Sequence, residues 1–204
     1  MNPQSLFKYT FIDNSSSKTI FLFHGTGGDE TDFLFLNEQL DKKYNLVGLK
    51  GNVDENGMNR FFRRVSLGVF DQENIKEEVE KLRVFISEWM KTNNVTVENT
   101  IFLGYSNGAN ILLAFLFYHP ELINNALLLH PMLPFGPKEK LDLESKRIFL
   151  AYGTRDSMVS LEESNRLIHL LKSYNAQVTT KEYSFGHEIT NSEVADAVEY
   201  LRKM

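Results

Sequence analysis

The most constraining feature of the chain is a serine that has a glycine two residues away on either side. Ser106 lies between Gly104 and Gly108. An apolar, strand-like run precedes it at residues 100–103, and a helix-like run follows at residues 109–118. This pattern is typical of a nucleophile elbow, a strained strand-to-helix turn that only small neighbours allow. It predicts an α/β fold with an exposed serine hydroxyl near the positive end of a helix.

A pair of residues later in the chain have the types and positions that are needed to activate the serine. A serine hydroxyl is weak until a base removes its proton, and a third group must orient that base. After an elbow, the acid and the histidine follow in that order. Asp156 follows an apolar run at residues 147–152, and His187 follows an alternating run at residues 178–183. Because parallel sheets place their sites past strand ends, we predict Ser106, Asp156 and His187 as catalytic residues.

Other acids and histidines fit these roles less well. Asp142 precedes an expected strand, and Asp196 lies within the last expected helix. His24 is expected to brace the loop that follows it by hydrogen bonding. His130 ends an expected strand and could border the site, but it precedes Asp156 and so breaks the chain order. No His-x-x-x-His pattern or carboxylate–histidine cluster indicates a metal, and we predict none.

A glycine-rich loop follows the apolar run at residues 19–23. Its sequence, HGTGGDE at residues 24–30, can present backbone N–H groups to a developing negative oxygen. In this arrangement one donor comes from the early loop and the other from the residue after the nucleophile. We therefore predict the amides of Thr26 and Asn107 as the oxyanion hole. A phosphate cradle is the alternative, but the loop lacks a following Lys-Ser/Thr and a G-x-G-x-x-G register.

Strand-like and helix-like segments alternate, which predicts a mostly parallel sheet with helices on both faces. The expected strands are residues 7–12 (an antiparallel edge), 19–23, 45–49, 100–103, 126–129, 147–152 and 178–183. The expected helices are residues 31–40, 73–92, 109–118, 161–173 and 193–202. Without a repeat or a linker, residues 1–204 are expected to form one domain.

Two longer segments, residues 51–70 and 131–146, are expected to be loops, and such loops are usually functional or mobile. We predict that five of their side chains line the substrate pocket: Phe61, Phe62, Met132, Leu133 and Phe135. Core packing is the alternative for each of them. Three arginines, Arg60, Arg63 and Arg64, could bind an acidic or phenolic substrate. Pairing with surface carboxylates is the favoured interpretation, because charge clusters are usually solvated.

Composition excludes several classes of protein. The chain has no cysteine, which excludes a disulfide framework, a thiolate metal site and a cysteine nucleophile. Its net charge of −5 gives no general attraction to nucleic acid or anionic membranes. The longest uncharged apolar run, residues 111–118, is too short to span a bilayer, and no secretory signal is visible. We expect a cytoplasmic protein without a nucleic-acid or membrane partner.

Four segments, HGTGGDE, GYSNGAN, YGTRDSMV and FGHE, resemble in this order the phospholipase/carboxylesterase family of small α/β-hydrolases. Residues 56–64 resemble a bacterial carboxylesterase branch linked to hydroquinone and catechol resistance. The resemblance implies a single-domain α/β-hydrolase without a large lid, and a homodimer. Acyl-protein thioesterases carry Gln and then Gly-Gly after the serine, whereas this chain has Asn107-Gly108-Ala109. That difference argues against an acylated-protein substrate.

These features together predict a serine carboxylesterase that cleaves small short-chain or aryl esters through an acyl-enzyme and needs no cofactor. A thioesterase or lysophospholipase of the same family is one alternative, since only the leaving group differs. A non-catalytic ligand-binding α/β-hydrolase is the other, because a fold does not dictate function. A complete set of Ser106, Asp156 and His187 argues against a binding module, which has no need of all three.

Overall fold

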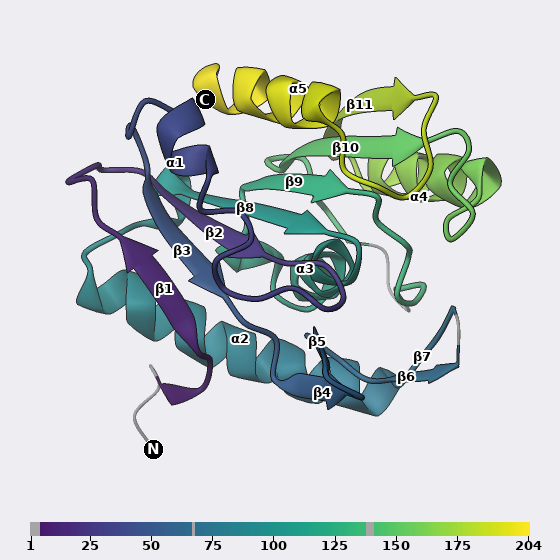
Figure 1. Cartoon of the computed structure of the whole chain (residues 1–204), viewed down its shortest axis with the longest axis horizontal. Coiled ribbons are helices and arrows are strands. Elements are labelled where there is room, and N and C mark those ends of the chain that lie inside the picture. The colour runs from purple at the N-terminus through teal and green to yellow at the C-terminus, as the bar shows by residue number, and fades with distance from the viewer. Residues whose placement is uncertain (1–4, 67, 138–140) are drawn as a thin grey trace.

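A twisted seven-stranded sheet forms the centre of the computed structural model, which describes residues 5–66, 68–137 and 141–204 (Figure 1). The strand order is β1-β3-β2-β8-β9-β10-β11. Only the edge strand β1 is antiparallel to its neighbour, and the other pairs are parallel. The strands are β1 (Tyr9–Ile12), β2 (Thr19–Phe23), β3 (Asn45–Leu49), β8 (Thr100–Tyr105), β9 (Asn125–Leu129), β10 (Arg147–Gly153) and β11 (Gln177–Tyr183).

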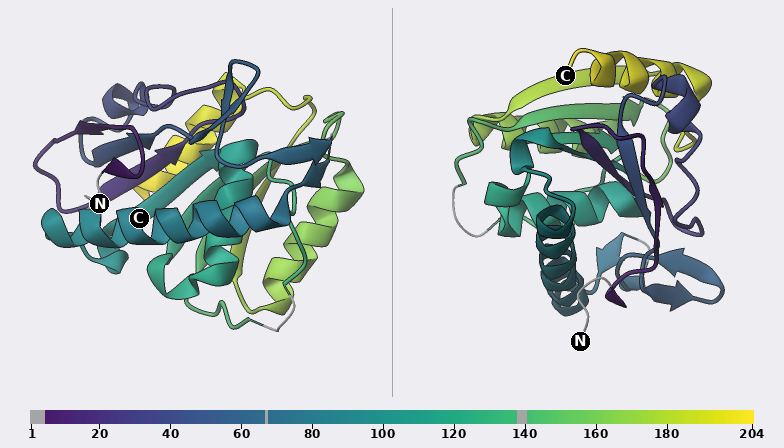
Figure 2. Two further views of the ribbon diagram at one scale, coloured as in Figure 1. Left: turned by 90° about the horizontal axis from the view of Figure 1, so that it is seen from below. Right: turned by 90° about the vertical axis from the view of Figure 1, so that its left-hand side faces the viewer.

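Helices cover both faces of this sheet and make it the middle of three layers (Figure 2). On one face lie α2 (Gln72–Thr92), α3 (Asn107–Tyr118) and α4 (Leu161–Ser173), and on the other lie α1 (Leu36–Gln39) and α5 (Asn191–Arg202). Each face has its own apolar core. Along β2, Phe21 and Phe23 enter the first core while Ile20 and Leu22 enter the second. The strand is therefore buried on both faces, as its continuous apolar sequence requires.

The longest helix, α2, shows how the sequence pattern sets the packing. Its apolar residues recur at helical spacing, and the side chains of Ile75, Val79, Leu82, Ile86 and Trp89 are buried. The helix begins after Asp71, whose carboxylate accepts a hydrogen bond from the N–H of Asn74 at 3.0 Å. The predicted helix at residues 73–92 is thereby confirmed.

The architecture is that of an α/β-hydrolase, as the resemblance implied, but two predicted elements need correction. Residues 31–40 form a helix only at Leu36–Gln39. Before it, the chain makes turns with i→i+3 hydrogen bonds, and the Asp29 carboxylate accepts hydrogen bonds from the Thr31 N–H and hydroxyl. These local bonds compete with a regular helix.

The second correction concerns residues 51–70, which were expected to be a structureless loop. They contain two hairpins, β4 (Val53–Glu55) with β5 (Met58–Arg60), and β6 (Arg64–Ser66) with β7 (Val69–Phe70). Asn56 and Gly57 both have positive φ and form the first turn, a combination that tight two-residue hairpins favour.

The other expected loop, residues 131–146, has no helix or strand in its described parts, 131–137 and 141–146. Within the described chain, no helix is both long enough and apolar enough to cross a membrane.

Candidate active site

The predicted elbow lies at the carboxyl end of β8, in the middle of the sheet. Ser106 has φ = 50° and ψ = −114°, and α3 begins at the next residue. A Cβ on Gly104 would lie 2.6 Å from the carbonyl oxygen of Gly108, and a Cβ on Gly108 would lie 2.3 Å from that of Phe23. Both glycines are therefore needed for α3 to begin this close to β8 and β2.

The structure brings Ser106, His187 and Asp156 together at the ends of three strands. The Ser106 Oγ lies 2.8 Å from His187 Nε2, and His187 Nδ1 lies 2.7 Å from Asp156 Oδ2. This order of contacts lets the ring donate from Nδ1 and accept from the hydroxyl at Nε2. The Tyr105 hydroxyl donates a hydrogen bond to the His187 carbonyl oxygen at 2.7 Å and so holds the histidine loop.

The side chain of Asp156 is buried, and both of its oxygens take part in hydrogen bonds. Its Oδ1 accepts hydrogen bonds from the N–H groups of Met158 and Val159 at 2.8 and 2.9 Å. Burial alone would raise the pKa of Asp156, but these hydrogen bonds and those from two histidines hold it below its ordinary value. The carboxylate is therefore charged at neutral pH and can orient His187.

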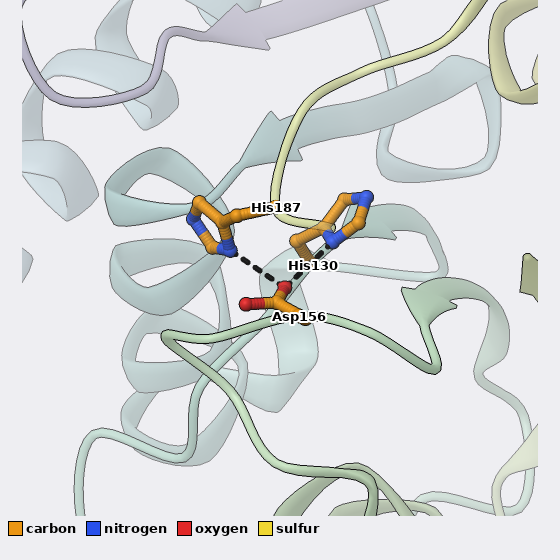
Figure 3. Close-up of side chains that lie close together, drawn as sticks. All are labelled: His130, Asp156 and His187. Carbon is orange, nitrogen blue, oxygen red and sulfur yellow. Dashed lines mark hydrogen bonds and ion pairs between the residues drawn. The ribbon is translucent and has the colours of Figure 1, made fainter. Parts of the chain in front are cut away.

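A second histidine, His130, contacts the same carboxylate oxygen (Figure 3). Its Nδ1 lies 2.9 Å from Asp156 Oδ2, and its Nε2 lies 2.7 Å from Glu193 Oε1. Burial lowers the pKa of His130, but the hydrogen bonds and charges of Glu193 and Asp156 outweigh this and raise it overall. Because both nitrogens face carboxylates, this site favours the imidazolium form, which can donate from both nitrogens.

Chain order had argued against His130, because it precedes Asp156. A better signal is its place after the buried strand β9, which is the direct neighbour of β10 in the sheet. The ends of adjacent parallel strands meet at one edge, so His130 and Asp156 lie together. His130 also has φ = 49°, a strained conformation for this residue type.

The sequence showed no carboxylate–histidine cluster, yet the fold creates one from His130, Asp156 and His187. Their potential ligand atoms all lie within 4.8 Å of one another. Both histidines use the nitrogen that faces Asp156 in a hydrogen bond to it, at distances typical of charge-assisted bonds. These hydrogen bonds account for the spacing of the three side chains.

The residues predicted for the oxyanion hole flank Ser106. Asn107 is the first residue of α3, where a backbone N–H has no intrahelical acceptor, and Thr26 lies in the glycine-rich loop after β2. The Thr26 hydroxyl accepts a hydrogen bond from Arg60 Nη1 at 2.7 Å. The side-chain oxygen of Asn107 accepts one from the Phe61 N–H, also at 2.7 Å. Both predicted donors are thus held by β5 and the residue after it.

His24 braces the same loop, as expected. Its Nδ1 lies 2.5 Å from the Gly25 carbonyl oxygen, and its Nε2 accepts a hydrogen bond from the Gly51 N–H at 2.9 Å. Burial lowers the pKa of His24, so the ring is neutral and Nε2 can accept.

A small cavity of about 40 Å³ opens beside Ser106. Its lining consists of Thr26, Arg60, Arg64, Gly68, Phe70, Ser106, Asn107, Asn110, His130, Met132, Met158, Val159 and His187. Of the five predicted pocket residues, Met132 is in this set. The cavity has room for only a small group beside the serine.

The other four predicted pocket residues lie elsewhere. Phe61 and Phe62 are fully buried in the core, with Phe61 packed 5.2 Å from the ring of Phe23. Leu133 and Phe135 pack against the outside of the same core, where Phe135 lies against the rings of Phe117 and Tyr118. The apolar character of these side chains thus serves packing, which was the stated alternative.

The three arginines have different environments. Arg63 is exposed and pairs with Asp71 at 3.0 Å, and Arg64 pairs with Glu55 at 2.9 Å, as the favoured interpretation predicted. Arg60 also pairs with Glu55, at 3.5 Å, but it is not a solvated surface residue, because only 4% of it is exposed. Burial lowers the pKa of its guanidinium, which nevertheless stays charged in proteins.

Comparison with known proteins gives consistent matches over nearly the whole chain. The sequence model of the phospholipase/carboxylesterase family matches residues 12–204. The putative hydrolase MhqD of Bacillus subtilis is 35% identical over 196 residues, which cover 96% of this chain and 98% of MhqD.

Solved structures agree with that match. The Bacillus cereus carboxylesterase is 39% identical, with a TM-score of 0.90 and coverage of 97% of this chain and 94% of that one. A carboxylesterase from Mesorhizobium loti is 28% identical, with a TM-score of 0.91 and coverage of 98% and 96%.

Proposed function

The chain belongs to the phospholipase/carboxylesterase family of α/β-hydrolases, and from this premise we propose that it is a serine carboxylesterase acting on small esters. The observation that carries the proposal is the chain of hydrogen bonds from Ser106 through His187 to Asp156, on a strained elbow. The small cavity beside the serine supports short acyl or alcohol groups.

The proposed reaction has two halves. In the first, the Ser106 Oγ attacks the ester carbonyl while His187 Nε2 takes its proton, and Asp156 stabilises the resulting imidazolium. The amides of Thr26 and Asn107 donate to the negative oxygen of the tetrahedral intermediate. His187 then protonates the departing alcohol and leaves an acyl-enzyme. In the second half, water attacks the acyl group with His187 again as base, which releases the acid and restores the serine.

The decisive test uses an organophosphorus probe, whose phosphoryl oxygen needs the same oxyanion donors and whose phosphorus needs the same activated serine. We expect stoichiometric labelling at Ser106 by peptide mapping, together with hydrolysis of short-chain esters. Ser106→Ala should abolish both and leave the melting temperature within about a degree or two, because the hydroxyl serves chemistry and not packing.

A matched control is Ser173→Ala, which removes an exposed hydroxyl on α4 and should change neither labelling nor hydrolysis. His187→Ala should slow labelling by orders of magnitude. Labelling at another serine, or full hydrolysis by Ser106→Ala, would sink the proposal. Matched oxygen esters and thioesters of one short acid would show which leaving group the enzyme prefers.

A further inference from the structure

The cavity beside Ser106 is unusual in its charge. Two arginines, Arg60 and Arg64, line it, and its described lining contains no aspartate or glutamate. The Arg60 side chain is 5% exposed and that of Arg64 is 26% exposed, so neither is an ordinary solvated surface cation. Both arginine side chains therefore border the small space that we propose as the substrate site.

Their counter-charge is incomplete. Both arginines share one carboxylate, Glu55: Arg64 Nε lies 2.9 Å from its Oε1, and Arg60 Nε lies 3.5 Å from its Oε2. The other contacts of Arg60 are neutral, namely the Thr26 hydroxyl, the Phe62 carbonyl oxygen and the face of the Phe62 ring. Two guanidinium groups and one carboxylate leave one positive charge in excess.

The imidazolium of His130 also lines the cavity, but it contributes no similar excess. Its two nitrogens face two carboxylates, Asp156 and Glu193, which compensate its charge. The excess charge therefore belongs to the arginine side. A buried cation without a full counter-charge is costly, and an arriving anion would relieve that cost.

We propose that Arg60 and Arg64 bind a carboxylate on the substrate, so that the enzyme selects short esters carrying a carboxylate a few bonds from the scissile carbonyl. This inference rests on the proposed carboxylesterase function. A planar guanidinium matches a carboxylate with two parallel N–H donors, and two such groups fix its position beside Ser106. Monoesters of short dicarboxylic acids are the simplest members of this class.

Arg60 has a second role that must be kept apart from substrate selection. Because it donates to Thr26 in the predicted oxyanion loop, its loss would slow hydrolysis of every ester. Within the described chain, Arg64 makes no hydrogen bond or ion pair with that loop, so it is the better residue to test. Arg63 is the matched control, since its guanidinium pairs with Asp71 and it does not line the cavity.

The experiment compares kcat/KM for two pairs of esters that differ only in charge. The first pair, methyl hydrogen succinate and methyl succinamate, carries the carboxylate or the neutral amide on the acyl side. The second pair, carboxymethyl acetate and carbamoylmethyl acetate, carries it on the alcohol side. We expect the wild-type enzyme to prefer the charged member of one pair by roughly 10- to 100-fold, the range expected for hydrogen bonds to a charged group.

Arg64→Gln should remove most of that preference, because kcat/KM should fall far more for the charged ester than for its neutral partner. Arg64→Lys keeps the charge and should retain part of the preference, and Arg63→Gln should retain all of it. Thermal unfolding of each variant checks that it is folded.

Three results would overturn the inference: no preference in the wild type, an equal loss on charged and neutral esters in Arg64→Gln, or an equal loss of preference in Arg63→Gln. If no ester of any kind is hydrolysed and Ser106 is not labelled, the proposed function itself fails. Hydrolysis of neutral esters without a charge preference overturns only the role of the arginines.

Discussion

The surroundings on the two sides of Ser106 differ in burial and in the pairing of charges. On one side, His130, Asp156 and Glu193 have side chains that are 1% exposed, and each charge has a partner at hydrogen-bond distance. On the other side, the hairpins of residues 53–70 carry exposed valines at Val65 and Val69 and two arginines that share one carboxylate. The first side is closed and sets one imidazolium between two carboxylates, whereas the second is open and sets two guanidinium groups against one carboxylate.

This difference fits the roles that we propose for the two sides. A base must hold its geometry to within a fraction of an ångström for proton transfer, so the groups that orient His187 are locked by hydrogen bonds and burial. A recognition surface must instead keep donors for a ligand that comes and goes. Closed networks therefore suit the chemical step, and incompletely paired charges suit selection.

The largest expected effect on activity comes from substituting Asp156, the acid that contacts both histidines on the closed side. Asp156→Asn should keep the fold but leave His187 in the wrong tautomer, and we expect kcat to fall by as much as ~10⁴-fold, as in other triads. Asp142→Asn and Asp196→Asn are controls, because these acids contact other groups, such as Lys181 and Tyr183 for Asp196. Steady-state kinetics would refute the assignment if Asp156→Asn stayed near wild type.

The next largest effect is on stability, and it concerns the hairpin side, where Phe61 belongs to the core. Phe61→Ala should destabilise the fold by about 4 kcal/mol, because it empties a fully buried site between Phe23 and His24. Phe70→Ala, at a half-buried residue of the cavity wall, should cost much less stability and act mainly on KM. Urea unfolding and kinetics would separate the two. Equal losses of stability would contradict this division.

A third prediction tests the charge of His130. Its folded pKa is raised, so protonation stabilises the fold below the pKa of unfolded histidine, about 6.5, and this contribution is lost as the pH rises through the folded pKa. His130→Gln should therefore lower the free energy of unfolding by roughly 3 kcal/mol at pH 6 and by clearly less at alkaline pH.

The groups facing His130 are Asp156, Glu193, His187 and Tyr105, so the controls must leave these in place. His119→Gln is a suitable one, since this histidine lies at the end of α3 opposite Ser106 and pairs with Glu80. Melting temperatures measured across the pH range would count against a charged His130 if its variant lost the same stability at every pH.

The smallest effect is expected at an exposed position of the second hairpin, within β6. Val65 is 73% exposed, and Val65→Thr should change stability by less than about 0.5 kcal/mol and leave kcat/KM unchanged. A strong loss of activity in this variant would show that the hairpin closes over the substrate and is not an open wall.

The closed side was the more predictable from sequence. Ser106, Asp156 and His187 each follow a recognisable strand, and the rules of the α/β fold state where such residues meet. His130 was expected to border the site, and it lines the cavity beside Ser106. Its contacts with Asp156 and Glu193 were missed because these residues are distant in the chain and meet it only through the order of β9 and β10 and the start of α5. The order of residues along the chain predicts the roles within a triad, whereas the order of strands in the sheet predicts which other residues contact it.

The hairpin side was less predictable, for physical reasons. Its strands are two or three residues long, too short to show an alternating pattern. The Asn56-Gly57 pair was a local signal of the first hairpin. Phe61 and Phe62 are adjacent, and whether both rings face the core or the pocket depends on the path of the backbone and not on composition. The same path separates buried Arg60 from exposed Arg63.

The left-handed backbone at Ser106 places this position under opposing evolutionary pressures. Glycine adopts a φ of 50° more readily than a residue with a side chain, so a glycine here would relax the elbow. Some serine codons are one base away from glycine, which keeps that relaxed variant within easy mutational reach. It would lack the hydroxyl that contacts His187, so only continued demand for the reaction keeps the serine. In a lineage that lost its substrate, Ser106 should be among the first residues to drift.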